Sequence, residues 1–349
     1  MLSPEYLAHV AEKIRNEAEE LEDEILFIVL LFLLAEDKKS VIHTVPTLSA
    51  RINSVVASYR ATGNAIIRKT IENTIAQTER DSVAFESASM TTYEKELVRH
   101  WEKVSQDTWY NLTQTQAYEA VNTYVREVDE AARKVMQGEA HDKVWKDTAR
   151  RLGEGGMPIT TADGRTEQVS TCVERNLRTA VSRMSGDLEL ESAKRNGFTT
   201  VLVSAHLGAR PTHEVWQGKV YSLTGKTEQY DDFYTATGYG TMLGLCGINC
   251  RHSFSPWMKG MPNPYENFDN EESRKRWEIE QRQRALERRV RQWKRRVKEA
   301  EAECKAFPED EECKKHLHET RRKWSDARQD YRFFCKVHDL RPLEERLKA

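Results

Sequence analysis

Apolar residues recur at helical spacing through the first third of the chain. A first stripe runs from Leu7 to Phe32 with steps of three, four or seven residues. Ser3–Pro4–Glu5 stands in front of it and offers a helix cap, a first-turn proline and an acidic residue. Further stripes predict a second helix over about 48–78 and a long third helix over about 92–136. Such helices are stabilised mainly by packing of their apolar stripes, so we expect them to bundle together or against a partner.

The pattern changes after Gly153–Gly156, a run of residues typical of a loop. Another helix is predicted over about 167–195, ended by Asn196–Gly197. Strand signals follow: Thr199–Val203 is short and rich in β-branched residues, and Lys219–Leu223 alternates polar and apolar side chains. Glycines and prolines surround both segments, which predicts a small α+β module among the helices.

The last third of the chain predicts an antiparallel helical hairpin. Apolar residues alternate four and three positions apart over 286–304, and the alternation resumes over 313–334. Pro308 and the acidic residues after it suit the first turn of the second helix. Cys304 and Cys313 flank the connecting loop on the predicted seam. A disulfide is one interpretation of this pair, and small apolar fillers are the favoured one under reducing conditions.

These patterns together predict a mainly α-helical protein with a small central α+β module. We expect an N-terminal helical region over 1–152, the α+β module over 153–265 and the helical hairpin over 266–349. Hydrophobic residues make up 38% and charged residues 32% of the chain, and the mean hydropathy is −0.74. This composition is typical of long helices with solvated faces. The net charge of −2 excludes a polycation that binds nucleic acid with its whole surface.

The most apolar run, Ile25–Ala35, is about half as long as the ~20 residues that cross a membrane, and acidic residues crowd its front. We therefore expect a buried helix and a soluble protein with no membrane partner. The first residues lack a basic region followed by an apolar one, so no secretory signal is expected. The six cysteines are unevenly spaced in a long chain, which favours a reducing environment over a disulfide framework.

One block, Ser204–Trp257, holds an unusual density of glycine, histidine and cysteine. Its most distinctive segments are Ser204–His213, Trp216–Lys219, Thr237–Thr241 and Gly244–His252. This block resembles the phage minor capsid protein 2 family, relatives of the Mu F-like head-morphogenesis proteins. The resemblance also includes Gln281–Arg288 and the segment near Arg178–Thr179, and it extends over about residues 165–300.

The resemblance implies a structural minor capsid protein of a tailed phage, with several copies in the head near the portal. The expected partners are the portal protein, other head proteins and further copies of this chain, in a virion assembled in the host cytoplasm. It implies no established catalytic activity, and we expect no enzyme.

Histidines and cysteines in the block are candidate zinc ligands. Zinc takes about four such ligands, often in a closed structural site. The candidate set is His206, His213, Cys250 and His252, with Cys246 as an alternate. Cys250 and His252 alternate, so on a strand they would face one side. In broader relatives the positions matching His213 and His252 often hold cysteine, an exchange that a metal site tolerates. The block lacks the CxxC and HxxxH spacings, and hydrogen-bonded core or turn residues are the alternative interpretation.

Two catalytic interpretations meet obstacles. Gly225–Lys226–Thr227 resembles the end of a phosphate-binding loop, but Val220 occupies the position where that loop requires glycine. His206, Asn249 and His252 could mimic a nuclease site, but the basic residues nearby are scattered among acids. A metal-dependent nuclease or hydrolase built on this block is the alternative to the structural function.

Other residues of the block have structural interpretations. Arg210 is expected to pair with Glu214 or Asp231, with a phosphate contact as the alternative. Trp216 and Tyr239 are expected in the core rather than as ligand platforms. The glycines of the block are expected to serve positive φ angles or close backbone approach. They are Gly238, Gly240, Gly244 and Gly247.

The first helix of the predicted hairpin is strongly basic. The densest candidates for contact with packaged DNA are Arg288, Arg289, Arg291, Lys294 and Arg295. Attraction to a polyanion would favour such contact. The alternative is a solvated face of the hairpin whose charge is offset by the acidic residues of 299–312.

Overall fold

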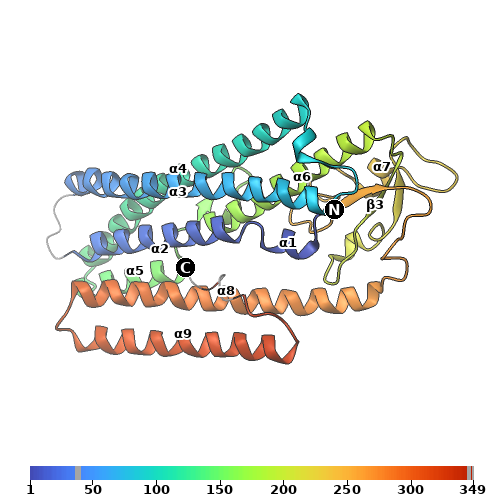
Figure 1. The fold of residues 1–349 in the computed structure, drawn as a ribbon. Coiled ribbons are helices and arrows are strands. Elements are labelled where there is room, and N and C mark those ends of the chain that lie inside the picture. Colours follow the sequence, from blue (N-terminus) through green and yellow to red (C-terminus); the bar gives the residue numbers. More distant parts are fainter. Residues whose placement is uncertain (36–40, 344–346, 348–349) are drawn as a thin grey trace. The chain divides into compact units, whose positions relative to one another are not determined.

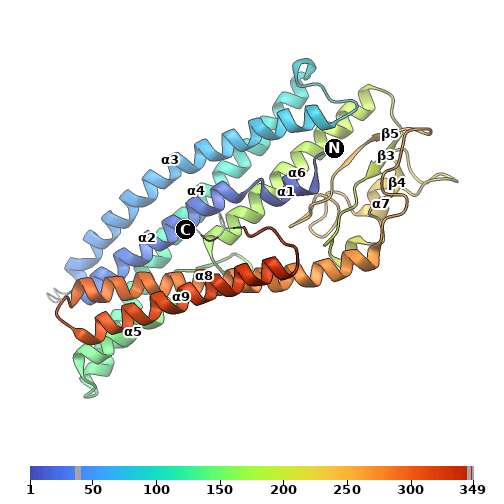
Figure 2. The same cartoon turned by 60° about the horizontal axis from the view of Figure 1, so that its bottom comes forward.

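The computed structural model describes residues 1–35, 41–343 and 347, without the side chains of 41–43 (Figures 1 and 2). By its internal contacts the chain divides into two compact units. The first comprises Met1–Ile14, Asn64–Thr108 and Val173–Gln281; the second comprises Arg15–Gly63, Trp109–Cys172 and Arg282–Ala349.

Helices dominate the fold, as predicted. The α-helices are α1 (Pro4–His9), α2 (Glu12–Leu34), α3 (Val41–Asp81), α4 (Thr92–Met136), α5 (His141–Gly155), α6 (Val169–Arg195), α7 (Phe233–Thr237), α8 (Asn270–Ala306) and α9 (Glu311–Val337). Short 3-10 helices are η1 (Ser87–Ser89) and η2 (Pro211–His213). The strands are β1 (Ile159–Thr160), β2 (Thr166–Glu167), β3 (Thr200–Val203), β4 (Val220–Ser222) and β5 (Phe254–Trp257).

The N-terminal helices largely follow the sequence prediction. Ser3 caps α1 by accepting a hydrogen bond at Oγ from the Tyr6 backbone N–H (3.1 Å), and Pro4 occupies the first turn. The predicted first helix is interrupted at Val10–Ala11, between α1 and α2. The apolar spacing runs through the interruption without a change of phase, so the pattern gives no sign of it. The predicted bounds of α4 are confirmed, whereas α3 begins earlier than predicted and contains Pro46.

Helix α5 lies at the end of the predicted N-terminal helical region, where the sequence indicated no separate helix. The loop predicted from Gly153 is wrong, because α5 continues to Gly155. The helix is amphipathic, with a buried stripe that includes Val144 and Leu152. Gly153 suits its buried position, since a Cβ there would lie 2.3 Å from the Cβ of Glu299 on α8. The helix ends at Gly156, which has a φ of +70° and donates its N–H to the Leu152 carbonyl. Packing therefore outweighs the low helix propensity of glycine here.

Both predicted strands of the central module are confirmed as β3 and β4. They form an antiparallel sheet of order β4-β3-β5. In register, Val201 lies opposite Tyr221 on β4 and opposite Pro256 on β5. Helix α6 ends as predicted at Asn196–Gly197, where Gly197 has a φ of +74°.

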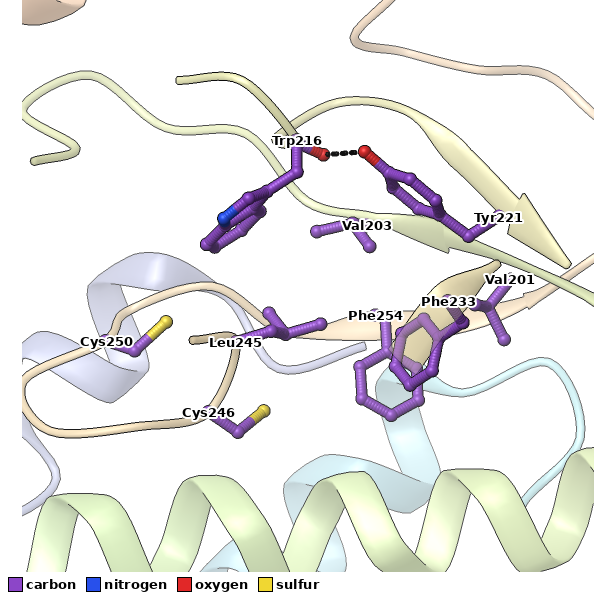
Figure 3. Packing of buried hydrophobic residues seen from close by; sticks show 9 residues of the cluster. All are labelled: Val201, Val203, Trp216, Tyr221, Phe233, Leu245, Cys246, Cys250 and Phe254. Atoms are coloured by element: carbon purple, nitrogen blue, oxygen red, sulfur yellow. Dashed lines mark hydrogen bonds between the residues drawn. The ribbon is translucent and has the colours of Figure 1, made fainter. Parts of the chain in front are cut away.

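The sheet covers an apolar core within the first unit, shown in Figure 3. Phe233 from α7 and Phe254 from β5 pack edge to face, with ring centroids 4.9 Å apart. The Tyr221 hydroxyl donates to the Trp216 carbonyl (2.9 Å), which satisfies a buried polar group. Cys246 and Cys250 lie in the loop at one side of this core.

Helices α8 and α9 form the predicted hairpin, and they lie antiparallel in both views (Figures 1 and 2). Side chains of the predicted seam are buried, among them Val290 and Tyr331. Asp310 caps α9 by accepting from the backbone N–H groups of Glu312 (2.8 Å) and Cys313 (3.4 Å). The prediction that Pro308 starts the second helix is wrong, since Asp310 is the N-cap and Pro308 lies in the loop.

All six cysteines have free thiols. Cys313 is buried and donates from Sγ to a carboxylate oxygen of Glu303 (3.0 Å), while Cys304 is half-buried. Cys313 is therefore a hydrogen-bond donor on the seam rather than an apolar filler. Among the described residues, no helix is both long and apolar enough to span a membrane. The side chains of the apolar run Ile25–Leu34 are mostly buried.

Candidate functional site

The candidate ligands come from three segments around the sheet. His206 follows β3, His213 lies in η2, and Cys250 and His252 immediately precede β5. The expectation that Cys250 and His252 share a strand is wrong, because β5 begins only at Phe254. Their side chains nevertheless converge, since the loop before β5 is held by its own turns.

That loop is folded closely on itself by glycine. A Cβ on Gly244 would lie 2.0 Å from the Gly238 carbonyl oxygen, and a Cβ on Gly247 would lie 2.5 Å from the Met242 carbonyl oxygen. Gly238 itself has a φ of +62° and ends α7. The sequence expectation that these glycines serve close approach and positive φ is confirmed. Cys246 also has a left-handed φ, +58°, which costs about 1–2 kcal/mol in a residue with a Cβ.

Three side chains form a compact buried group: His213, Cys250 and His252. Their candidate ligand atoms all lie within 4.8 Å of one another. The two Nδ1 atoms are 3.4 Å apart, and Cys250 Sγ lies 3.6 Å from His252 Nδ1 and 3.9 Å from His213 Nδ1. None of the three is more than 2% exposed.

The hydrogen bonds around this group define the tautomer of each imidazole. His213 Nε2 lies 3.1 Å from the Leu243 carbonyl oxygen, to which it must donate. His252 Nε2 donates to the amide oxygen of Gln217 (2.9 Å), whose amide nitrogen donates to Asn270 (2.8 Å). With both Nε2 atoms protonated, the Nδ1 atoms of the neutral rings carry lone pairs that face each other and the thiol.

Burial keeps these rings neutral. It lowers the pKa of His213 to about 4 and that of His252 well below the ordinary value, with nearby positive charge adding to both effects. Burial also raises the pKa of the Cys250 thiol. In chemical terms the group offers two imidazole lone pairs and one thiol in a dry site.

The other two predicted ligands lie at the edge of this group. The His206 ring lies over that of His252, with centroids 4.3 Å apart. His206 Nδ1 donates to the Leu207 carbonyl (2.9 Å), and its buried Nε2 has no hydrogen-bond partner in the structure. Burial lowers the pKa of His206 to about 3. Cys246 Sγ lies 3.9 Å from the His252 carbonyl oxygen, as does Cys250 Sγ.

Trp216 and Gln217 support the group, and sequence reasoning gave Gln217 no function. The Trp216 ring packs against His213 (centroids 4.5 Å apart) and His252 (4.7 Å), and it is only 5% exposed. This confirms its predicted place in the core. The Trp216–Gly218 run belongs to the block, but nothing in a single sequence indicates which imidazole a glutamine orients.

The predicted pairing of Arg210 is wrong. Its guanidinium donates to the Ile248 carbonyl (2.8 Å), while Glu214 pairs with Arg274 and Asp231 with Lys226. Arg210 therefore braces the loop before β5 through its backbone. The Ile248 carbonyl needs a hydrogen-bond donor, and the Arg210 guanidinium supplies it instead of forming an ion pair.

A second polar group lies on the hairpin, within the second unit, and sequence reasoning missed it. Arg150 donates to both carboxylate oxygens of Glu303 (2.9 and 3.2 Å), and His316 Nε2 lies 3.0 Å from a carboxylate oxygen of Glu299. The carboxylates thus have cationic or imidazole partners already, as buried charges require. This arrangement is an ion-pair network that joins α5, α8 and α9.

The predicted DNA-contact residues are divided between exposed and paired positions on α8. Arg288 and Arg289 are exposed, and Arg289 Nη1 lies 3.3 Å from a carboxylate oxygen of Asp330 on α9. Arg291 lies 3.6 Å from a carboxylate oxygen of Glu19, and Lys294 lies 2.9 Å from one of Asp23 on α2. Arg291, Lys294 and Arg295 line a recess in the second unit together with these acidic residues.

The comparisons with known proteins point to phage structural proteins. The chain is 29% identical to a "Structural protein" of Lactococcus phage LL-H over 140 residues, covering 38% of each chain. It is 45% identical to a "Structural protein" of Lactococcus phage mv4 over 51 residues, or 14% of this chain and 42% of that relative. The chain therefore aligns with less than half the length of either relative. No solved structure matches. The model of the family described as "Phage minor capsid protein 2" matches residues 33–335, and the chain belongs to this family.

Proposed function

We propose that the protein is a structural minor capsid component that acts in head morphogenesis, inside the head near the portal and in several copies. The observation that carries the proposal is the family match over 33–335, which includes helices α3 to α6, the central module and nearly all of the helical hairpin. The long helices and the helical hairpin suit an assembly protein, because their solvated faces are available to partners. The portal protein and other head proteins are the proposed partners, with assembly in the host cytoplasm.

The geometry of the Ser204–Trp257 block supports a structural rather than a catalytic function. The proposed nuclease set does not converge: His206 and His252 are buried, whereas Asn249 is exposed and its amide oxygen accepts from Arg178 (3.3 Å). Hydrolysis by a metal ion needs an open coordination position that substrate can reach. A closed group of neutral side chains favours a structural centre.

A direct assay separates this proposal from the metal-dependent nuclease or hydrolase. We expect the purified chain to leave DNA and RNA intact with Zn²⁺ or Mg²⁺ added. The His252→Ala variant should give the same result, with no difference in hydrolysis from the wild type. A hydrolytic activity that His252→Ala abolishes in a chain that stays folded would overturn the structural assignment.

We also propose three regions along the chain, namely the N-terminal helical region, the central α+β module and the C-terminal hairpin, and contact with packaged DNA by α8. Contact with packaged DNA would fall to the exposed Arg288 and Arg289, since the Arg291 and Lys294 side chains are only 20% and 16% exposed and lie against carboxylates on α2. Charge reversal at Arg288 and Arg289 should then abolish a steeply salt-dependent binding of DNA. Absence of binding at low salt would exclude this function.

The location in the particle is tested by fractionation. Purified virions are disrupted and separated into heads and tails, and the chain is quantified in each fraction by mass spectrometry. We expect the chain in the head fraction together with the portal protein. Recovery with the tails, or only in the lysate, would contradict the proposal.

A further inference from the structure

The group formed by His213, Cys250 and His252 has the dimensions of a tetrahedral zinc site. Bond lengths of about 2.0–2.1 Å to nitrogen and 2.3 Å to sulfur place tetrahedral ligand atoms about 3.3–3.4 Å (N to N) and about 3.6 Å (N to S) apart. The observed separations are 3.4 Å between the nitrogens and 3.6 and 3.9 Å between nitrogen and sulfur. Three ligand atoms already stand at nearly the spacing that a zinc ion would impose.

The Nδ1 lone pairs of His213 and His252 also point toward the position that a zinc ion would occupy. Because each Nε2 donates to an oxygen, two Nδ1 lone pairs meet in a site that is almost fully buried. Two facing lone pairs repel each other unless a proton or a cation lies between them. Histidines that bind a metal almost always donate their other N–H to an oxygen, as His213 does to Leu243 and His252 does to Gln217.

We infer that His213 Nδ1, Cys250 Sγ and His252 Nδ1 bind a structural Zn²⁺ ion, with Cys246 Sγ as the fourth ligand. This inference goes beyond the proposed function and does not depend on where the protein lies in the particle. On binding, Zn²⁺ replaces the protons of the two thiols, so each thiolate forms a bond to zinc and two protons pass to solvent.

Charge and chain geometry favour Cys246 over His206 for the fourth position. Two thiolates cancel the charge of Zn²⁺, whereas one thiolate and three imidazoles leave a net positive charge in a buried site, which is costly. Three residues separate Cys246 from Cys250, within the roughly two to four that join paired zinc cysteines. The left-handed φ of Cys246 turns the loop so that both sulfur atoms lie 3.9 Å from the same carbonyl oxygen. A change of its side-chain torsion is required for Cys246 to join the other three atoms.

Zinc content of the purified full chain tests the inference. After removal of loosely bound metal on a desalting column, we expect about one zinc per chain by mass spectrometry. Cys250→Ser and His213→Gln should lower this content at least tenfold. Cys304→Ser and His338→Gln are matched controls on the hairpin and should keep the zinc. Retention of the zinc by Cys250→Ser would overturn the inference.

Substitutions at Cys246 and at His206 distinguish the two candidates for the fourth zinc ligand. Cys246→Ser should weaken zinc affinity by more than the roughly 10–100-fold that loss of an outer-shell partner costs, and His206→Gln should weaken it less. The reverse order would overturn the assignment of Cys246.

A measurement on the unmodified chain guards against variants that fail to fold. Co²⁺ is added to metal-free wild-type chain, and the near-ultraviolet absorption of the cobalt–thiolate bond is followed. We expect the signal to saturate near one equivalent and to disappear when Zn²⁺ is added. No thiolate signal from folded chain would overturn the inference and leave the virion assignment untouched.

Discussion

Replacement of Gly244 by alanine should destabilise the loop that holds the two block cysteines. The added Cβ would lie 2.0 Å from the Gly238 carbonyl oxygen, 2.5 Å from its carbonyl carbon and 2.8 Å from the Thr237 carbonyl oxygen. All three are backbone atoms, so no side chain can rotate away. The backbone at Gly244 and the backbone at Thr237–Gly238 must separate by more than about 1 Å to reach ordinary van der Waals contact.

The expected cost follows from two effects. Overpacking of a close contact costs about 1–3 kcal/mol. Separation of the segments also breaks the hydrogen bond from the Leu245 backbone N–H to the Thr237 carbonyl (3.0 Å), which is worth about 1 kcal/mol. We therefore expect Gly244→Ala to lower the free energy of unfolding of the first unit by about 2–4 kcal/mol.

Urea unfolding and hydrogen exchange measure this effect. The urea midpoint reports stability, and exchange measured by mass spectrometry on peptides from 233–257 places the change in the block. Gly155→Ala in α5 is the matched control: its Cβ would meet nothing within 4 Å, so the free energy of unfolding should stay the same or rise by up to about 1 kcal/mol. If Gly244→Ala keeps both the urea midpoint and the exchange protection of the wild type, the backbone contact between Gly244 and Gly238 is not as close as the structure has it.

Three further substitutions test other parts of the structure. Burial raises the pKa of Glu22 from 4.5 to about 7, although its carboxylate accepts a hydrogen bond from the Ser170 backbone N–H. Between these two pH values the folded chain keeps a proton that the unfolded chain has released. The free energy of unfolding therefore falls as the pH rises from about 4.5 to about 7. Glu22→Gln should match the wild type at pH 4 and be more stable at pH 8 by on the order of 1–3 kcal/mol; urea midpoints that differ equally at both pH values would contradict this. Phe254→Ala removes a ring that is 1% exposed and should cost about 3–5 kcal/mol in calorimetry, and a loss below about 1 kcal/mol would show that the core is not packed as described. Gln217→Leu leaves the His252 Nε2–H without its acceptor and should cost about 1–3 kcal/mol in urea unfolding, whereas wild-type stability would mean that this hydrogen bond does not form.

The sequence predicted the helices whose apolar spacing is regular and the strands whose composition is distinctive. The hairpin of α8 and α9 was predicted because a heptad seam resumes after a short loop, and β3 because β-branched residues follow a glycine stop. The last turn of α5 was predicted as a loop because Gly153 is locally typical of one. Only the nearby Glu299 side chain explains why glycine is needed inside that helix.

The candidate site was predicted by residue type and not by geometry. The sequence indicated which histidines and cysteines belong to the block, and the structure brings His213, Cys250 and His252 within ligand distance. Gln217 could not be found in this way, since its function depends on a hydrogen bond across separate segments. Arg210 was assigned a carboxylate partner because charge complementarity is visible in sequence, whereas a loop carbonyl without a backbone partner is not.

The most direct test of the structural assignment is chemical cross-linking of intact purified particles, read by mass spectrometry. We predict that this chain is present in several copies per particle and that its lysines form cross-links to the portal protein and to other copies of the chain. Absence of the chain from purified particles, or cross-links to tail proteins alone, would contradict it.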